Sequence, residues 1–181
     1  MLPLDKLSDH ALQALSGAGV DTEHIDIAFY MDLGLDANFG QVYLAISKQD
    51  GKIYRVAEEV ESFSLRALTD ASIDNFTTTN RLTATLHKED DVAPEKTEDM
   101  TDEEFRELKK AYDARGQAVI VGFCTNSCKR KLLAFINIWE RLGRGEEVSE
   151  EDPIFEQFFA KCPKCGQIFD DPLRRICKNC T

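Results

Sequence analysis

The chain has 181 residues, 43% of them hydrophobic and 30% charged, which is the balance of an ordinary globular protein with one main core. Its formal net charge of −11 at pH 7 disfavours nucleic acids and anionic lipid headgroups as partners, because an acidic surface repels both. No apolar run approaches the about 20 residues that cross a bilayer, and the N-terminus lacks a basic stretch followed by a long apolar one. We therefore expect neither a membrane span nor a signal peptide.

The first predicted element is an amphipathic helix over residues 4–16, where apolar side chains recur at helical spacing before Gly17 and Gly19. The pattern then changes to the two-residue alternation of strands. The Asp50-Gly51 pair predicts one tight hairpin turn, and residues 32–40 predict another. Six strands in succession favour an antiparallel meander. These strands are expected near residues 25–30, 42–47, 53–55, 63–65, 73–76 and 82–86.

An acidic segment interrupts the strand pattern. Residues 89–104 are mostly acidic and polar and predict a solvated loop. A helix follows, with Thr101 as its N-cap and Glu104 three positions later completing a capping box. The apolar stripe of this helix is formed by Phe105, Leu108 and Tyr112. We interpret residues 89–116 as a helical insertion within the sheet.

A last strand, over residues 118–123, leads into a long amphipathic helix that Asn126 or Ser127 is expected to cap. The cationic residues Lys129, Arg130 and Lys131 lie at the start of this helix, where the helix dipole disfavours positive charge. This basic cluster therefore needs a reason other than helix stability. The buried face of the helix is predicted to consist of Leu132, Phe135, Ile136, Trp139 and Leu142.

A linking helix is expected over residues 147–160, with Ser149 as its cap and Pro153 in its first turn. Its phenylalanines are candidate contact residues that dock the end of the chain onto the sheet or onto a partner; they are Phe155, Phe158 and Phe159. The predicted organisation is an N-terminal helix (1–22), a β domain (23–146) with an insertion at about 89–116, the linking helix (147–160) and a small module (161–181).

The small module contains two CxxC pairs, formed by Cys162, Cys165, Cys177 and Cys180. Four thiolates complete a tetrahedral shell around one Zn²⁺ and leave no open position, which predicts a structural zinc ribbon without catalytic function. Redox CxxC motifs normally occur singly, and disulfides are disfavoured in a chain that lacks a signal peptide. Because a module of about 20 residues has too little core, we expect metal binding to supply its folding energy.

Other candidate residues favour a structural interpretation. Cys124 and Cys128 are expected to pack in or beside the core, with a reactive or metal-binding pair as the alternative. The three histidines are expected at the surface; they are His10, His24 and His87. We find no phosphate-binding GxxxxGK[ST] loop, no GxSxG and no HExxH, so nothing in the sequence argues for catalysis.

The stretch from Met31 to Ser47, MDLGLDANFGQVYLAIS, resembles the start of the N-terminal cytoplasmic extension of certain bacterial ABC exporters of the multidrug type. The cysteine module, CPKCG with DPLRRICKNC, and the passage of Phe123-Cys124 into the long helix are also similar. The resemblance implies a pleckstrin-homology-like meander of seven antiparallel strands with a C-terminal helix, followed by a zinc ribbon. It also implies that ATP binding and transport belong to parts of the exporter beyond this chain.

The expected fold class is therefore α+β: a pleckstrin-homology-like meander with a four-cysteine zinc ribbon. The expected function is a non-catalytic accessory domain, cytoplasmic and at the inner face of the plasma membrane, that contacts the rest of an exporter or a dimer mate. Two alternatives remain. One is a stand-alone zinc-ribbon regulator that binds protein or nucleic acid, although residues 161–181 carry five basic and two acidic residues, a weak phosphate footprint. The other is a lipid-headgroup module that uses Lys129, Arg130 and Lys131.

Overall fold

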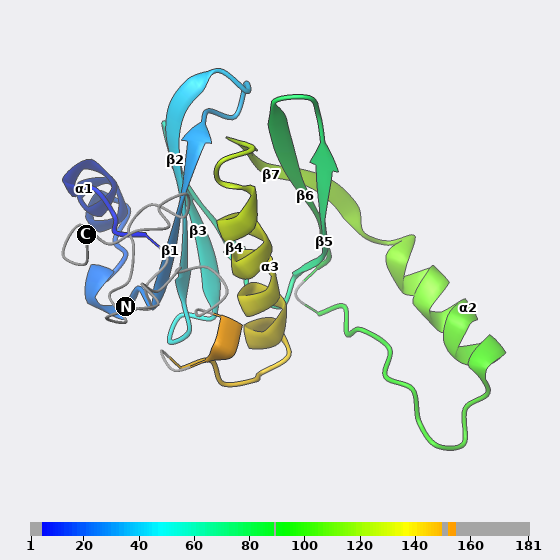
Figure 1. Ribbon diagram of the computed structural model, residues 1–181. Coiled ribbons are helices and arrows are strands. Elements are labelled where there is room, and N and C mark those ends of the chain that lie inside the picture. The colour runs from blue at the N-terminus through cyan, green and yellow to red at the C-terminus, as the bar shows by residue number, and fades with distance from the viewer. Residues whose placement is uncertain (1–4, 89, 150–151, 155–181) are drawn as a thin grey trace, which may run out of the picture.

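A seven-stranded antiparallel sheet forms the body of the protein (Figure 1). The computed structural model describes residues 5–88, 90–149 and 152–154. The strand order is β4-β3-β2-β1-β7-β6-β5, so two meanders meet where β1 lies beside β7. This arrangement confirms the α+β class and the seven antiparallel strands expected from the sequence. The strands are β1 (Ile27–Leu33), β2 (Phe39–Ser47), β3 (Lys52–Val56), β4 (Val60–Ser64), β5 (Leu68–Asn75), β6 (Thr79–Leu86) and β7 (Gln117–Thr125).

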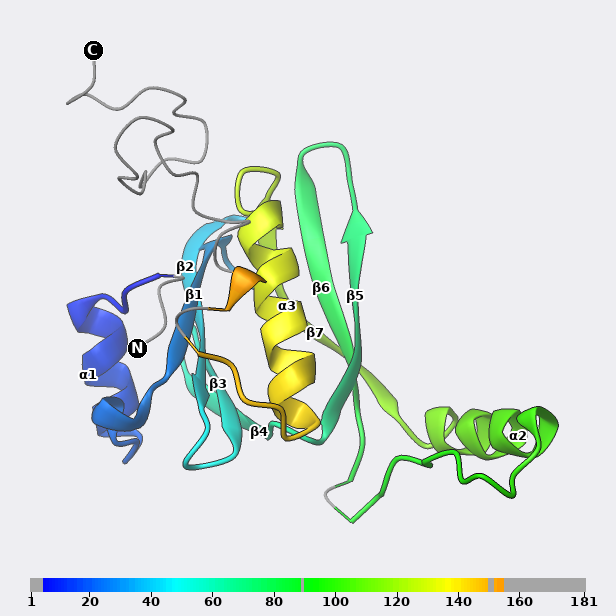
Figure 2. The ribbon, with the colours of Figure 1, turned by 60° about the horizontal axis from the view of Figure 1, so that its bottom comes forward.

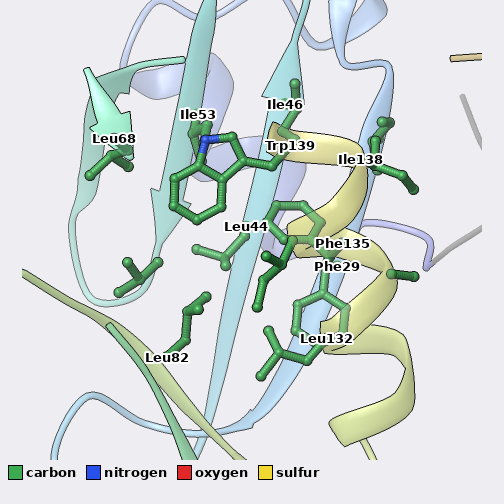
Figure 3. Packing of buried hydrophobic residues seen from close by; sticks show 14 of the residues in the cluster. Phe29, Leu44, Ile46, Ile53, Leu68, Leu82, Leu132, Phe135, Ile138 and Trp139 are labelled. Atoms are coloured by element: carbon green, nitrogen blue, oxygen red, sulfur yellow. The ribbon is translucent and has the colours of Figure 1, made fainter. Parts of the chain in front are cut away.

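The long helix α3 (Lys129–Gly143) lies between the two halves of the sheet (Figures 1 and 2). All five apolar residues predicted for its buried face are buried in the main core. Phe135 stacks on Phe29 of β1, with ring centroids 5.5 Å apart. Figure 3 shows Trp139 beside Leu44 and Ile53 of the first meander. The helix thus fills the concave side of the sheet, because its apolar face is wide enough to contact both meanders.

The other face of the first meander is covered by α1 (Asp9–Gly17). Along β1, β2 and β3, side chains that point into the main core alternate with side chains that point toward α1. The latter are therefore buried as well, and form a second apolar cluster with α1. This second cluster includes Leu7, Ala11, Leu15, Ile25, Ala28, Tyr43, Ala45, Tyr54 and Val56. A short 3₁₀ turn, η1 (Thr22–His24), leads from α1 into β1.

The first helix begins later than the sequence predicts. Ser8 is its N-cap and accepts a hydrogen bond from the Ala11 amide at 3.2 Å, so the prediction of a helix from residue 4 is wrong. Asp5 is used by the sheet instead: its amide donates to the Ala28 carbonyl, and its carboxylate accepts from the Tyr30 amide, each at 3.0 Å. Pairing with β1 satisfies this backbone better than an extra helical turn with an unpaired end.

Both predicted hairpin turns are present. In the turn between β1 and β2, the Gly34 amide donates to the Asn38 carbonyl at 2.7 Å, and Ala37 adopts a φ of 63°. Asp36 supports this turn by accepting from the Asn38 amide at 3.0 Å. In the turn between β2 and β3, Gly51 has a φ of 62°, a conformation that glycine adopts without a steric penalty.

Residues 87–88 and 90–116 belong to an arm that leaves the sheet at the end of β6 and returns at the start of β7. The two strands pair directly, from Leu86 opposite Gln117 to Thr79 opposite Thr125. The arm carries α2 (Asp102–Asp113) and projects away from the body (Figure 2). The predicted capping box is confirmed: the Glu104 amide donates to Thr101 Oγ1 at 3.3 Å, and the Glu104 carboxylate accepts from the Thr101 amide at 2.9 Å.

Arg55 links the two meanders. Its Nη1 donates to the Ile120 carbonyl of β7 at 2.7 Å, and its Nε donates to the Glu61 carboxylate of β4 at 2.9 Å. Strand β7 has a bulge here, because Leu82 pairs with Gly122 and Thr83 with Ile120. Such a bulge interrupts the ladder of backbone hydrogen bonds, and the guanidinium provides a donor at this point. Since β2 and β1 separate β3 from β7 in the sheet, the contact requires the sheet to curve strongly.

Candidate interaction surfaces

The proposed zinc ligands and contact phenylalanines lie outside the described residues. This applies to Cys162, Cys165, Cys177 and Cys180, and to Phe155, Phe158 and Phe159. Within the part of the chain that the structure describes, no group of three or more His, Cys, Asp or Glu side chains is arranged to hold a metal ion. In the same part, no helix combines the length and the apolar character that crossing a membrane requires.

The chain that follows α3 returns to the core where the linking helix was expected to begin. Val148 is buried, and Ile154 packs against the main cluster. The Asp152 carboxylate accepts from the Ile154 amide at 3.1 Å and pairs with Arg141 of α3 at 2.8 Å. Asp152 thus ties this segment to α3, whereas the predicted linking helix with its Ser149 cap lies largely outside the described residues.

The basic cluster is divided between a structural role and the surface. Lys131 Nζ lies 2.7 Å from the Asp5 carboxylate, which also accepts from the Tyr30 amide. Lys131 therefore links the segment before α1 to the start of α3. This ion pair explains why a cation lies at a position that the helix dipole disfavours. Arg130 is exposed and Lys129 is half-buried. Of the three cations proposed for lipid headgroups, one is thus already paired.

The predicted cap of α3 is wrong. The N-cap residue is Cys128, whose side chain makes no capping hydrogen bond. The side-chain amide of Asn126 instead donates to the Thr77 carbonyl at 3.1 Å, and its oxygen accepts from Asn80 at 3.0 Å. Ser127 Oγ lies 2.6 Å from Thr125 Oγ1. Asn126 thus binds the β5–β6 hairpin, and Ser127 contacts the end of β7. Because both side chains hold the β7–α3 connection in place, neither is free to cap the helix.

Cys124 and Cys128 have the environment of packing residues. Cys124 is fully buried in the main core, and Cys128 is half-buried beside it. Burial raises the pKa of the Cys124 thiol to about 12, and burial together with the nearby Asp32 carboxylate raises the pKa of Cys128. A protonated thiol is a poor nucleophile and a poor metal ligand. The geometry thus favours the packing interpretation over a reactive pair.

We expect Cys124 in the folded protein to resist alkylation. At a pH below 9, a pKa of about 12 instead of 9.0 lowers the thiolate fraction roughly a thousandfold, since each unit is tenfold. The rate of its labelling by iodoacetamide should keep increasing as the pH rises through 9 and 10, whereas the labelling rate of a free thiol levels off in this range. Peptide mapping by mass spectrometry measures this, with guanidinium-unfolded protein as the fully reactive control. Native Cys124 labelled as fast as the unfolded residue would contradict the assignment.

A stacked pair of rings closes the base of the arm. His87 and Tyr112 lie with ring centroids 3.8 Å apart and planes 10° from parallel. His87 is 4% exposed, so the expectation that it lies at the surface is wrong. A side chain at Gly116 would clash with the His87 ring and with Thr85, which explains the glycine there. The guanidinium of Arg115 covers the outer side of Tyr112 and pairs with Asp91 at 3.5 Å.

The distal part of the arm forms an open groove. Its walls are the segment that leads out to α2 and the first two turns of the helix, and it is lined by Thr97, Asp99, Met100, Glu103, Glu104, Glu107 and Leu108. Leu108 keeps 48% of its surface exposed. The sequence indicated the apolar stripe to which Leu108 belongs. It did not indicate that Tyr112 alone of this stripe is buried, because that depends on the contact with His87.

The chain was compared with models of protein families, with curated proteins and with solved structures, and none of them matches it.

Proposed function

We propose that this chain is a non-catalytic interaction module: a pleckstrin-homology-like β domain followed by a zinc ribbon. It would be the N-terminal cytoplasmic part of a bacterial ABC exporter of the multidrug type, at the inner face of the plasma membrane. The observation that supports this proposal is the strand order, with α3 directly after β7 and seated in the concave side. A seven-stranded meander followed by a packed helix is the arrangement that the resemblance implies.

The structure also offers a reason for a contact role. Two faces of the body are used for its own packing, since α3 fills the concave side of the sheet and α1 covers the first meander. The arm projects from the body, and the stacked rings of His87 and Tyr112 hold its two strands of chain together at the base. An element that projects from a packed scaffold is suited to reach another protein, either the rest of an exporter or a dimer mate.

Zinc is the cofactor of this proposal, and its binding is the first test. Protein purified with ample zinc and kept reduced should contain one zinc per chain by elemental analysis. The double variant Cys177→Ser, Cys180→Ser removes half of the proposed ligands and should reduce bound zinc to background, because two thiolates do not complete the tetrahedral shell.

Cys128→Ser is the matched control for this measurement. It removes a thiol that is half-buried beside the main core, and it should leave the zinc content at one per chain. Zinc absent from the unmodified protein would refute the ribbon. Equal loss from the control and from the double variant would show that the metal is held elsewhere.

The exporter context is tested separately by the length of the native gene product. We expect a longer protein with hydrophobic helices and a phosphate-binding loop after residue 181. A complete native protein of 181 residues would refute the exporter context and leave the zinc measurement unaffected.

A further inference from the structure

The groove on the arm combines an apolar floor with an acidic rim. Met100 and Leu108 contribute the apolar surface, and Asp99, Glu103 and Glu107 are the rim carboxylates that remain after Glu104 is used in the capping box. Among the described residues, these three carboxylates form no ion pair, whereas Asp102 at the same end of the helix pairs with Lys96. A half-exposed leucine bordered by unpaired carboxylates is an incomplete contact surface.

The charge of the surrounding segment is strongly one-sided. Residues 90–104 contain eight carboxylates and a single cation, Lys96. Such a segment attracts cations over a distance and repels acidic surfaces. A second copy of the chain, with its own net charge of −11, is therefore a poor occupant of the groove. An anionic bilayer or a nucleic acid is disfavoured for the same reason.

We propose that the groove binds a basic amphipathic segment of another protein. An aliphatic side chain of that segment would rest against Met100 and Leu108, while flanking Lys or Arg side chains would pair with Asp99, Glu103 and Glu107. The apolar contact supplies affinity, and the rim supplies selectivity and a fast approach. This inference rests on the interaction role proposed above and specifies the chemistry of the partner.

The test uses the full chain and a synthetic peptide probe of about 14 residues, four helical turns, in which leucine and lysine alternate at helical spacing. A second peptide replaces every leucine with serine and keeps the charge. Fluorescence anisotropy at about 0.1 M salt should show the Leu/Lys peptide binding at least tenfold more tightly than the Ser/Lys peptide. That ratio separates a groove with an apolar floor from simple attraction between opposite charges.

Leu108→Gln should lower the affinity for the Leu/Lys peptide at least tenfold, because it removes the apolar floor and leaves every charge in place. Leu133→Gln is the matched control. Leu133 lies on α3 and is 50% exposed, nearly the same as Leu108, and its replacement should leave the affinity unchanged. Unchanged thermal midpoints for both variants show that the fold is retained.

The rim is tested by the double variant Glu103→Gln, Glu107→Gln. It should lower the affinity for the same peptide several-fold, and the affinity should then change less with salt concentration. Glu58→Gln, Glu59→Gln makes the same change of charge in the exposed turn between β3 and β4 and should have little effect. Chemical-shift changes in backbone NMR spectra should be concentrated in residues 97–108.

Three results would overturn the inference: equal affinities for Leu108→Gln and Leu133→Gln, equal binding of the two peptides, or shift changes centred outside the arm. A homodimer in sedimentation that Leu108→Gln dissociates would also overturn it, because a second copy would then occupy the groove. None of these results changes the zinc content or the length of the native product, so the inference and the proposed function can fail independently.

Discussion

Replacing Trp139 with alanine is expected to lower the free energy of unfolding by about 3–5 kcal/mol. Trp139 is 1% exposed, and its indole lies beside Leu44 and Ile53, between α3 and the first meander (Figure 3). Truncation leaves a cavity that surrounding strands fill only in part, because each of them is held by the hydrogen bonds of the sheet. Urea unfolding followed by circular dichroism measures the change.

Leu133→Ala is the matched control for this prediction. It lies in the same helix but is half exposed, and alanine is the better helix former. Its effect should stay below about 1 kcal/mol. Similar losses for Trp139→Ala and Leu133→Ala would mean that α3 is not seated in the concave side of the sheet.

Replacing Arg55 with methionine is expected to cost about 2–4 kcal/mol. Methionine approximates the aliphatic part of the side chain but has no donor for the Ile120 carbonyl, which Arg55 contacts at 2.7 Å. The curved sheet would then lose its polar link between β3 and β7. The Glu61 carboxylate would lose its partner too, at a smaller cost, since its side chain is 47% exposed and can be hydrated.

Arg81→Met is the control that distinguishes the effect of this link from that of an ordinary surface ion pair. Arg81 pairs with Asp74 of the neighbouring strand and lies 5.5 Å from the ring of Phe76, much as Arg55 pairs with Glu61 and lies 5.5 Å from the ring of Phe63. Its side chain is more exposed, and no contact of Arg81 joins the two meanders within the described part of the chain. We expect a loss of less than about 1 kcal/mol. Equal losses for Arg55→Met and Arg81→Met would contradict the role of the link.

The features of the fold that follow from local patterns could be predicted from the sequence. Alternating apolar residues indicated the strands, Asp50-Gly51 indicated a hairpin turn, and Thr101 with Glu104 indicated the start of α2. The spacing of Leu132, Phe135 and Trp139 identified the face of α3 that is buried. Each of these patterns acts within a few residues, so a single chain segment contains all the information.

The features that were missed depend on partners distant in the sequence. Asp5 lies outside α1 because its backbone and carboxylate bind β1. Asn126 does not cap α3 because Asn80 and Thr77 engage it. The burial of His87 depends on Tyr112, which follows 25 positions later. The same limit applies to the candidate surface: the apolar stripe of α2 was visible, whereas the groove exists only because the outgoing segment folds back beside the helix.

The direct pairing of β6 with β7 has a consequence for how this chain can change over evolutionary time. The arm begins and ends at neighbouring positions of one ladder, Leu86 and Gln117, so its length is not constrained by the distance that it spans. Closing a longer loop costs little additional entropy. Related sequences can therefore lengthen, shorten or replace the arm while the sheet and its helices stay the same. The surface that contacts a partner can thus change without a change in the fold.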